Sequence, residues 1–178
     1  MSKNSRCFGH DGEDRLRKNI LILVIGAAVV VAVDQITKWA VVSRFTLHES
    51  YPVIQGFFNL VYVMNPGAAF GFLAKASESF RSLFFIGMTL FVMLLIIYYV
   101  IKSKEDRSLN VICMTLIFSG AAGNLLDRVR FGAVVDFLDF YIHTWHWPAF
   151  NVADSAITVG AVLMIWGMMV RRGKETQS

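Results

Sequence analysis

The sequence predicts an all-α integral membrane protein of four transmembrane helices, and three observations support this fold class. Hydrophobic residues make up 56% of the 178 residues and charged residues only 17%, whereas soluble proteins carry about 25% charged residues. Four apolar stretches each approach the ~20 residues that a ~30 Å hydrocarbon core requires. Basic residues gather at the ends of these stretches, where they orient helices in a membrane. The net charge of +4 therefore does not indicate nucleic-acid binding.

The first predicted span covers residues 20–42 and follows a polar, charged tail at residues 1–19. We expect this tail to be mobile and cytoplasmic. Asp34 and Lys38 interrupt the span, so a cleaved signal peptide is an alternative reading of its uncharged first part. Because the apolar pattern continues past Lys38 and no clear small-x-small site follows, a full span is favoured.

The other three predicted spans cover residues 83–101, 109–126 and 152–170, and all four belong to one domain. The third contains the run Ser119-Gly120-Ala121-Ala122-Gly123. Small residues of this kind let helix backbones approach closely in lipid.

The distribution of Lys and Arg predicts the orientation. Eleven fall in the termini and in the loop between the second and third spans: Lys3, Arg6, Arg15, Arg17, Lys18, Lys102, Lys104, Arg107, Arg171, Arg172 and Lys174. Five fall in or beside the other two connections: Arg44, Lys75, Arg81, Arg128 and Arg130. Because cytoplasmic loops carry the excess of basic residues, both termini are expected in the cytoplasm.

Two outer segments follow from this orientation, at residues 43–82 and 127–151. The first contains a possible strand at Phe57–Val63 and the turn signal Asn65-Pro66-Gly67. The second is rich in aromatic residues, which suit the membrane–water interface. Its His143 and His146 lack a zinc-binding motif and are interpreted as interfacial anchors.

Nearly every polar group within the spans falls toward the predicted outer face. The set comprises Asp34, Lys38, Asn124, Asp127, Arg128, Asn151 and Asp154, with Asn65 and Asp136 in the outer segments. Asp34 and Lys38 are four residues apart and share a helix face, either as a stabilising ion pair or as the floor of a polar site. Ionisable residues inside a membrane are functional candidates by default.

The remaining members of this set also have plainer interpretations. Asn151 and Asp154 have the spacing of a helix capping box. Asn124, Asp127 and Arg128 share a face and could form an ordinary interfacial helix end. Asp136, in an outer loop, could simply be solvated.

The chemistry that this set offers is that of carboxylates. Two aspartates that share a site suppress each other's ionisation, so that one stays charged and the other protonated. The charged one can take a proton from water and the protonated one can polarise a carbonyl, as in an aspartic peptidase. No Ser-His-Asp arrangement presents itself, and neither a metal nor a cofactor is expected. Cys7 and Cys113 are expected to lie far apart.

The motifs resemble those of the lipoprotein signal peptidases, also called signal peptidase II, over residues 20–170. The matching stretches are Asp34-Gln35-Ile36-Thr37-Lys38, Asn65-Pro66-Gly67-Ala68-Ala69-Phe70-Gly71, Gly123-Asn124-Leu125-Leu126-Asp127-Arg128, Val134-Val135-Asp136-Phe137 and Phe150-Asn151-Val152-Ala153-Asp154-Ser155. They occur in the family's order, and five motifs in order are highly specific.

The resemblance implies roles for the polar residues. Asp136 and Asp154 would be the catalytic pair, and Asn65, Asn124, Arg128 and Asn151 would position the substrate and support the pair. Asp34, Lys38 and Asp127 would be structural. From the dipole at the start of the fourth helix, Asp154 is expected to act as the base and Asp136 as the acid.

The resemblance also implies a substrate and a location. The substrate would be a bacterial prolipoprotein, cleaved before a lipobox cysteine that carries diacylglycerol, and globomycin would inhibit the reaction. The protein would lie in the cytoplasmic (inner) membrane with its active site near the outer face, and residues 43–82 would hold a small extracytoplasmic β-cradle. A proton-coupled carrier using Asp34, Lys38 and Asp127, or a non-catalytic scaffold, is the alternative function.

Overall fold

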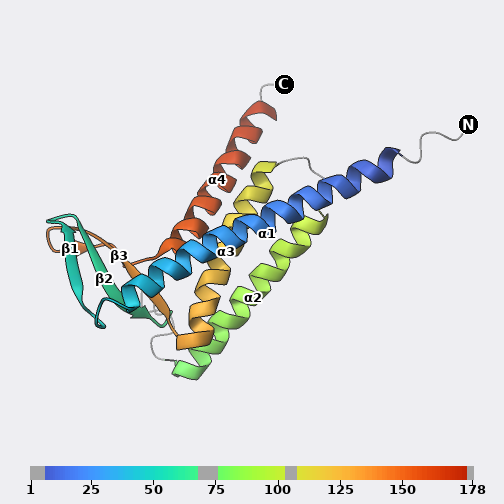
Figure 1. The fold of residues 1–178 in the computed structure, drawn as a ribbon. Coiled ribbons are helices and arrows are strands. Elements are labelled where there is room, and N and C mark those ends of the chain that lie inside the picture. The colour runs from blue at the N-terminus through green and yellow to red at the C-terminus, as the bar shows by residue number, and fades with distance from the viewer. Residues whose placement is uncertain (1–6, 68–75, 103–107, 176–178) are drawn as a thin grey trace, which may run out of the picture.

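The computed structural model describes residues 7–67, 76–102 and 108–175. Within these ranges the chain forms four long helices: α1 (Cys7–Val42), α2 (Glu78–Lys102), α3 (Ser108–Phe131) and α4 (Val152–Glu175). Each of the four contains a segment long and apolar enough to cross a membrane. The start of α1 and the end of α4 lie at one end of the bundle, and a small sheet lies at the other (Figure 1).

The helices are longer than the predicted spans. α1 begins at Cys7, so residues 7–19 extend the first helix instead of forming a separate tail, while residues 1–6 lie outside the described residues. α3 continues to Phe131 and therefore includes residues 127–131, which were expected in an outer segment. Hydropathy marks only the apolar part of a helix, so polar turns at its ends are not predicted.

Helix α3 packs against all three other helices. Its small residues permit the close approach: a Cβ atom added at Gly123 would lie 2.5 Å from Oδ2 of Asp34 on α1, and one at Gly120 would collide with the backbone of Ala153 on α4. The predicted role of the small-residue run is thereby confirmed.

The helices of the bundle are apolar outside and partly polar inside. Large apolar side chains such as Leu83, Leu94 and Trp166 are exposed along α2 and α4, whereas Asp34 and Asp127 are buried between helices. This distribution is expected where lipid is the solvent, because lipid-facing side chains must be apolar.

The sheet combines two segments that are distant in the sequence. Its antiparallel strands are β1 (Ser50–Ile54), β2 (Phe58–Asn65), β3 (Val134–Ile142) and β4 (Trp145–His146), in the order β1-β2-β3-β4. β2 confirms the predicted strand at residues 57–63. A cradle built only between the first two helices was too narrow a prediction, because β3 and β4 come from the aromatic-rich segment. The first four residues of β3 are all buried, so the alternation that reveals a strand is absent there.

Candidate active site

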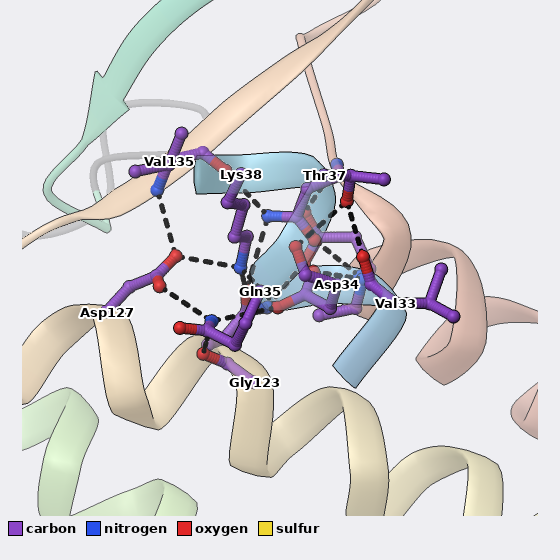
Figure 2. A network of polar contacts seen from close by, with 12 residues as sticks. Val33, Asp34, Gln35, Thr37, Lys38, Gly123, Asp127 and Val135 are labelled. Carbon is purple, nitrogen blue, oxygen red and sulfur yellow. Dashed lines mark hydrogen bonds and ion pairs between the residues drawn. The ribbon is translucent and has the colours of Figure 1, made fainter. Parts of the chain in front are cut away.

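An ion cluster centred on Lys38 lies near the sheet end of the bundle (Figure 2). The Lys38 Nζ atom lies 2.7 Å from Oδ2 of Asp127 and 2.9 Å from Oδ2 of Asp34. It also donates a hydrogen bond of 3.1 Å to Oδ1 of Asn124. The predicted Asp34–Lys38 pair is confirmed, and Asp127 joins it as a second buried carboxylate.

Gln35 completes this cluster and was not singled out from the sequence (Figure 2). Its Nε2 atom donates to Oδ1 of Asp127 at 3.0 Å and to Oδ2 of Asp34 at 3.2 Å, and its Oε1 accepts from Arg130 at 3.0 Å. The amide therefore gives a donor to Oδ1 of Asp127, whereas Lys38 pairs with Oδ2 of that residue, and a second donor to Oδ2 of Asp34. Its position directly after Asp34 in the sequence was the only indication that Gln35 could join the cluster.

The ion cluster also holds the elements that carry the two candidate catalytic aspartates. Asp34 Oδ1 accepts the backbone N–H of Ala153 in the first turn of α4 at 2.9 Å. Asp127 Oδ2 accepts the backbone N–H of Val135 at the start of β3 at 3.1 Å. The start of α4 and the start of β3 are thereby fixed to one buried group of charges.

Asp154 lies in the first turn of α4 and takes part in a capping box. The Asp154 N–H donates to Oδ1 of Asn151 at 2.9 Å, and the Asn151 N–H donates back to Oδ2 of Asp154 at 3.3 Å. The other carboxylate oxygen, Oδ1, accepts from Nδ2 of Asn124 at 2.7 Å. The capping-box interpretation is therefore confirmed, and the same carboxylate also accepts a hydrogen bond from Asn124.

Asp136 lies in β3 and not in a loop, and it is buried instead of solvated. Its Oδ2 accepts from Nδ2 of Asn65 at 2.9 Å, and its Oδ1 accepts from Nδ2 of Asn151 at 2.7 Å. Because Asn151 also bonds to Asp154, a single asparagine links the two carboxylates. Asn124 extends this network to Lys38, since its Oδ1 accepts from both Lys38 and Asn151.

Burial raises the pKa of Asp136 to about 7, and the nearby charge of Asp154 adds to this effect. Hydrogen bonds from Asn65 and Asn151, which favour the charged carboxylate, oppose it only in part. Near neutral pH this carboxyl group can therefore hold a proton.

Arg128 contacts a different helix from Asp127, its neighbour in the sequence. Its guanidinium lies over the ring of Phe85 on α2, 5.3 Å from the ring centroid. It interacts electrostatically with Asp154, Asp136 and Asp127. Of the three residues predicted to share a helix face, Asn124 and Asp127 bond to Lys38 on α1, whereas the guanidinium of Arg128 lies over a ring of α2.

A cavity of about 530 Å³ adjoins the hydrogen-bond network of Asp136 and Asp154. Asn65 and Asp154 contribute polar atoms to its lining, and Trp147, Phe150 and Val159 contribute apolar surface. A site with a carboxylate in an otherwise largely apolar wall suits a substrate that is itself mostly apolar.

A second carboxylate of β3, Asp139, lies outside this network and was also missed from the sequence. It accepts from Nδ2 of Asn59 at 2.9 Å and lies 2.9 Å from Nδ1 of His146. His146 was expected to be only an interfacial anchor. A lone Asp among aromatic residues offers no pattern from which this pairing could be inferred.

Comparisons with known proteins agree on one family. The family model for signal peptidase (SPase) II matches residues 26–170. A lipoprotein signal peptidase of Syntrophus aciditrophicus is 48% identical over 161 residues, which are 90% of this chain and 100% of that protein. A lipoprotein signal peptidase of Cupriavidus necator is 50% identical over 145 residues, 82% of this chain and 81% of that protein.

Solved structures show the same fold. A bacterial membrane enzyme determined by the in meso method at 1.9 Å resolution superimposes with a TM-score of 0.73 at 34% identity, covering 82% of this chain and 91% of that one. A second bacterial membrane enzyme structure, determined by the same method at 2.3 Å resolution, gives a TM-score of 0.76 at 33% identity and covers 85% of this chain and 90% of that one.

Proposed function

Because the chain belongs to the signal peptidase II family and is therefore a protease, we propose that it is an aspartic endopeptidase of bacterial prolipoproteins. It would cleave before a lipobox cysteine that carries diacylglycerol. The observation that carries the proposal is the pair Asp136 and Asp154, joined through Asn151 beside a cavity. Membership of a peptidase family disfavours the carrier and scaffold alternatives.

In this mechanism Asp154 is the base and Asp136 the acid. Asp154 takes a proton from a water molecule, whose oxygen adds to the scissile carbonyl carbon. Asp136, protonated because burial raises its pKa to about 7, donates to the carbonyl oxygen. When the C–N bond breaks, Asp154 returns its proton to the leaving amine and Asp136 regains the proton of the collapsing intermediate. No covalent intermediate is required.

The neighbouring side chains would hold this arrangement in place. Asn151 and Asn124 donate to carboxylate oxygens and restrict their rotation. The guanidinium of Arg128, which interacts electrostatically with both carboxylates, would stabilise the negative charge that develops on the carbonyl oxygen. Asn65, which lines the cavity and binds Asp136, would position the substrate against the acid.

The location of the site suits a lipid-anchored substrate. A diacylglyceryl cysteine is held in the membrane, so its scissile bond lies near the membrane surface. A reaction that consumes water must occur there too, because the bilayer centre is dry. Both candidate aspartates lie where the helices meet the sheet, Asp154 in the first turn of α4 and Asp136 in β3, and this is the end of the bundle away from the termini (Figure 1).

The test of this function is turnover by the purified protein in lipid. The substrate is a synthetic prolipoprotein segment, with and without diacylglycerol on its cysteine, and mass spectrometry identifies the new amino terminus. Cleavage immediately before the modified cysteine, blocked by globomycin, supports the proposal. Equal cleavage of the unmodified peptide, or none of the modified one, contradicts it.

We further propose that both termini are cytoplasmic and that the sheet is extracytoplasmic in the inner membrane. The described termini share one end of the bundle (Figure 1), and eleven Lys and Arg residues are expected on that side against five on the other. A reporter that is active only in the cytoplasm should be active after Lys174 and inactive when inserted within residues 46–56. The reverse pattern would place the site on the wrong face.

The rate of cleavage should fall as the pH rises through about 7. Only the protonated form of Asp136 can donate to the carbonyl oxygen, and its pKa is about 7, so the acid is lost above that pH. The profile of kcat at saturating substrate, measured on protein shown to stay folded, checks this. Because the two carboxylates are coupled, the midpoint belongs to the pair. A rate that keeps rising well above neutral pH contradicts the assignment of Asp136 as the acid.

A further inference from the structure

The ring of Phe85 on α2 contacts the turn that carries Asn65. Gly67 has a φ angle of +90°, a conformation that favours glycine. A Cβ atom at Gly67 would overlap three atoms of the Phe85 ring, the farthest of them 2.9 Å away. The ring therefore lies directly against the backbone of this turn and limits where the turn can move.

The turn at Gly67 also orients the side chain of Asn65. The N–H of Gly67 donates to Oδ1 of Asn65 at 2.9 Å, and Nδ2 of Asn65 donates to Oδ2 of Asp136 at 2.9 Å. Because one end of this amide is held by Gly67, the other end is presented to the carboxyl group. A shift of Gly67 would rotate the amide and lengthen the bond to Asp136.

The same ring also contacts a second part of the site. The guanidinium of Arg128 lies over its face at 5.3 Å from the centroid, within the range of a cation–π interaction. Phe84 packs edge-on against Phe85, with ring centroids 5.5 Å apart, which restricts rotation of the ring. Arg128 interacts with both Asp136 and Asp154, so its place over the ring sets the positive charge near both carboxylates.

We propose that Phe85 is a positioning residue of the active site, whose ring holds the Asn65 turn on one side and the Arg128 guanidinium on the other. It acts through Asn65 and Arg128 and does not touch the reacting atoms. This inference rests on the proposed peptidase function. It assigns a role to α2, from which the sequence motifs supply no residue.

The experiment compares Phe85→Leu, Phe85→Tyr and Phe91→Ala in the cleavage assay. Leu keeps apolar bulk against Gly67 but has no aromatic face, and we expect a roughly 10-fold lower kcat with KM within about 2-fold. The alkaline limb of the pH–rate profile of Phe85→Leu should move to higher pH. The Arg128 guanidinium is then held less firmly near the carboxylates and favours their charged forms less. Tyr keeps the face and should retain most of the rate. Phe91, an exposed residue of the same helix, is the matched control.

A wild-type kcat and pH profile for Phe85→Leu would overturn the proposal, as would an equal loss in Phe91→Ala. A second measurement needs no turnover, so it tests the role of Phe85 even if the proposed peptidase function is wrong. In thermal unfolding of Phe85→Leu, Arg128→Gln and the double variant, the losses of melting temperature should be less than additive, because each single change removes the same contact. Strictly additive losses would show that the ring and the guanidinium are not coupled.

Discussion

Replacing either Asp136 or Asp154 with Asn should lower cleavage per folded molecule by about 10²–10⁴-fold, the range that general acid–base catalysis supplies. Asn is close in shape to Asp, but it can neither take a proton from water nor hold the proton that the carbonyl oxygen needs. The double variant should be little slower than either single variant, because residues that act as one unit are strongly non-additive.

Each substitution also changes one hydrogen bond, and this effect must be separated from catalysis. Both oxygens of Asp154 accept hydrogen bonds, from Asn124 and from the backbone of Asn151. Asn offers only one oxygen, so one of these bonds is lost, at a cost of about 0.5–1.5 kcal/mol. The loss of stability should thus be modest beside the loss of rate.

Asp139→Asn is the matched control for this experiment. Asp139 lies three residues from Asp136 on the same strand, is likewise buried, and bonds to Asn59 and His146 outside the proposed site. Its variant should lose a comparable hydrogen bond yet cleave within about 3-fold of the unchanged protein. Turnover close to normal in Asp136→Asn or Asp154→Asn would refute the proposed pair. An equal loss in Asp139→Asn would show that any buried change in β3 abolishes activity.

Contacts within one helix were predicted correctly because helical spacing determines which residues share a face. The four-residue interval between Asp34 and Lys38 predicted their ion pair, and the three-residue interval between Asn151 and Asp154 predicted the capping box. Both are local rules that need no knowledge of the fold.

Contacts between segments were not accessible to such rules. Asn65 and Asp136 meet across 71 residues, and Gln35 and Asp127 across 92, so no periodicity relates them. The predicted orientation placed Asn65 and Asp136 on the same membrane face, and only the resemblance to a family gave them related roles. It supplied no role for Gln35 or Phe85, whose contacts depend on how α1 and α2 pack against the rest of the bundle.

Strand β3 was missed for a related reason. Alternation of buried and exposed residues arises when one face of a sheet meets solvent. Val134, Val135, Asp136 and Phe137 are all buried, and β3 packs against α1 and α3 as well as against its neighbouring strands. The burial of both faces at the start of β3, which removes the alternating pattern, is also the main reason why the pKa of Asp136 is raised.

Removal of Lys38 should destabilise the protein more than removal of either of its partners. Lys38→Met leaves Asp34 and Asp127 buried without their cation, and breaking a buried ion pair in this way costs about 3–5 kcal/mol. The bond from Lys38 to Asn124 is lost as well. Asp34→Asn should cost less, about 1–3 kcal/mol, because Lys38 keeps Asp127 at 2.7 Å and only one acceptor is replaced.

The two changes should also combine in an unusual direction. In the Lys38→Met background, Asp34→Asn removes one of two close, uncompensated carboxylates, so it should be neutral or stabilising there although it is destabilising alone. This reversal of sign distinguishes a charge cluster from ordinary packing, in which the two losses would add. Thermal unfolding of the single and double variants in lipid, with the exposed Trp39→Leu of the same helix as control, measures it. If Asp34→Asn destabilises both backgrounds equally, the cluster does not act through the charge of Lys38. If Asp34→Asn is fully stable yet inactive, Asp34 belongs with Asp136 and Asp154 in the catalytic set.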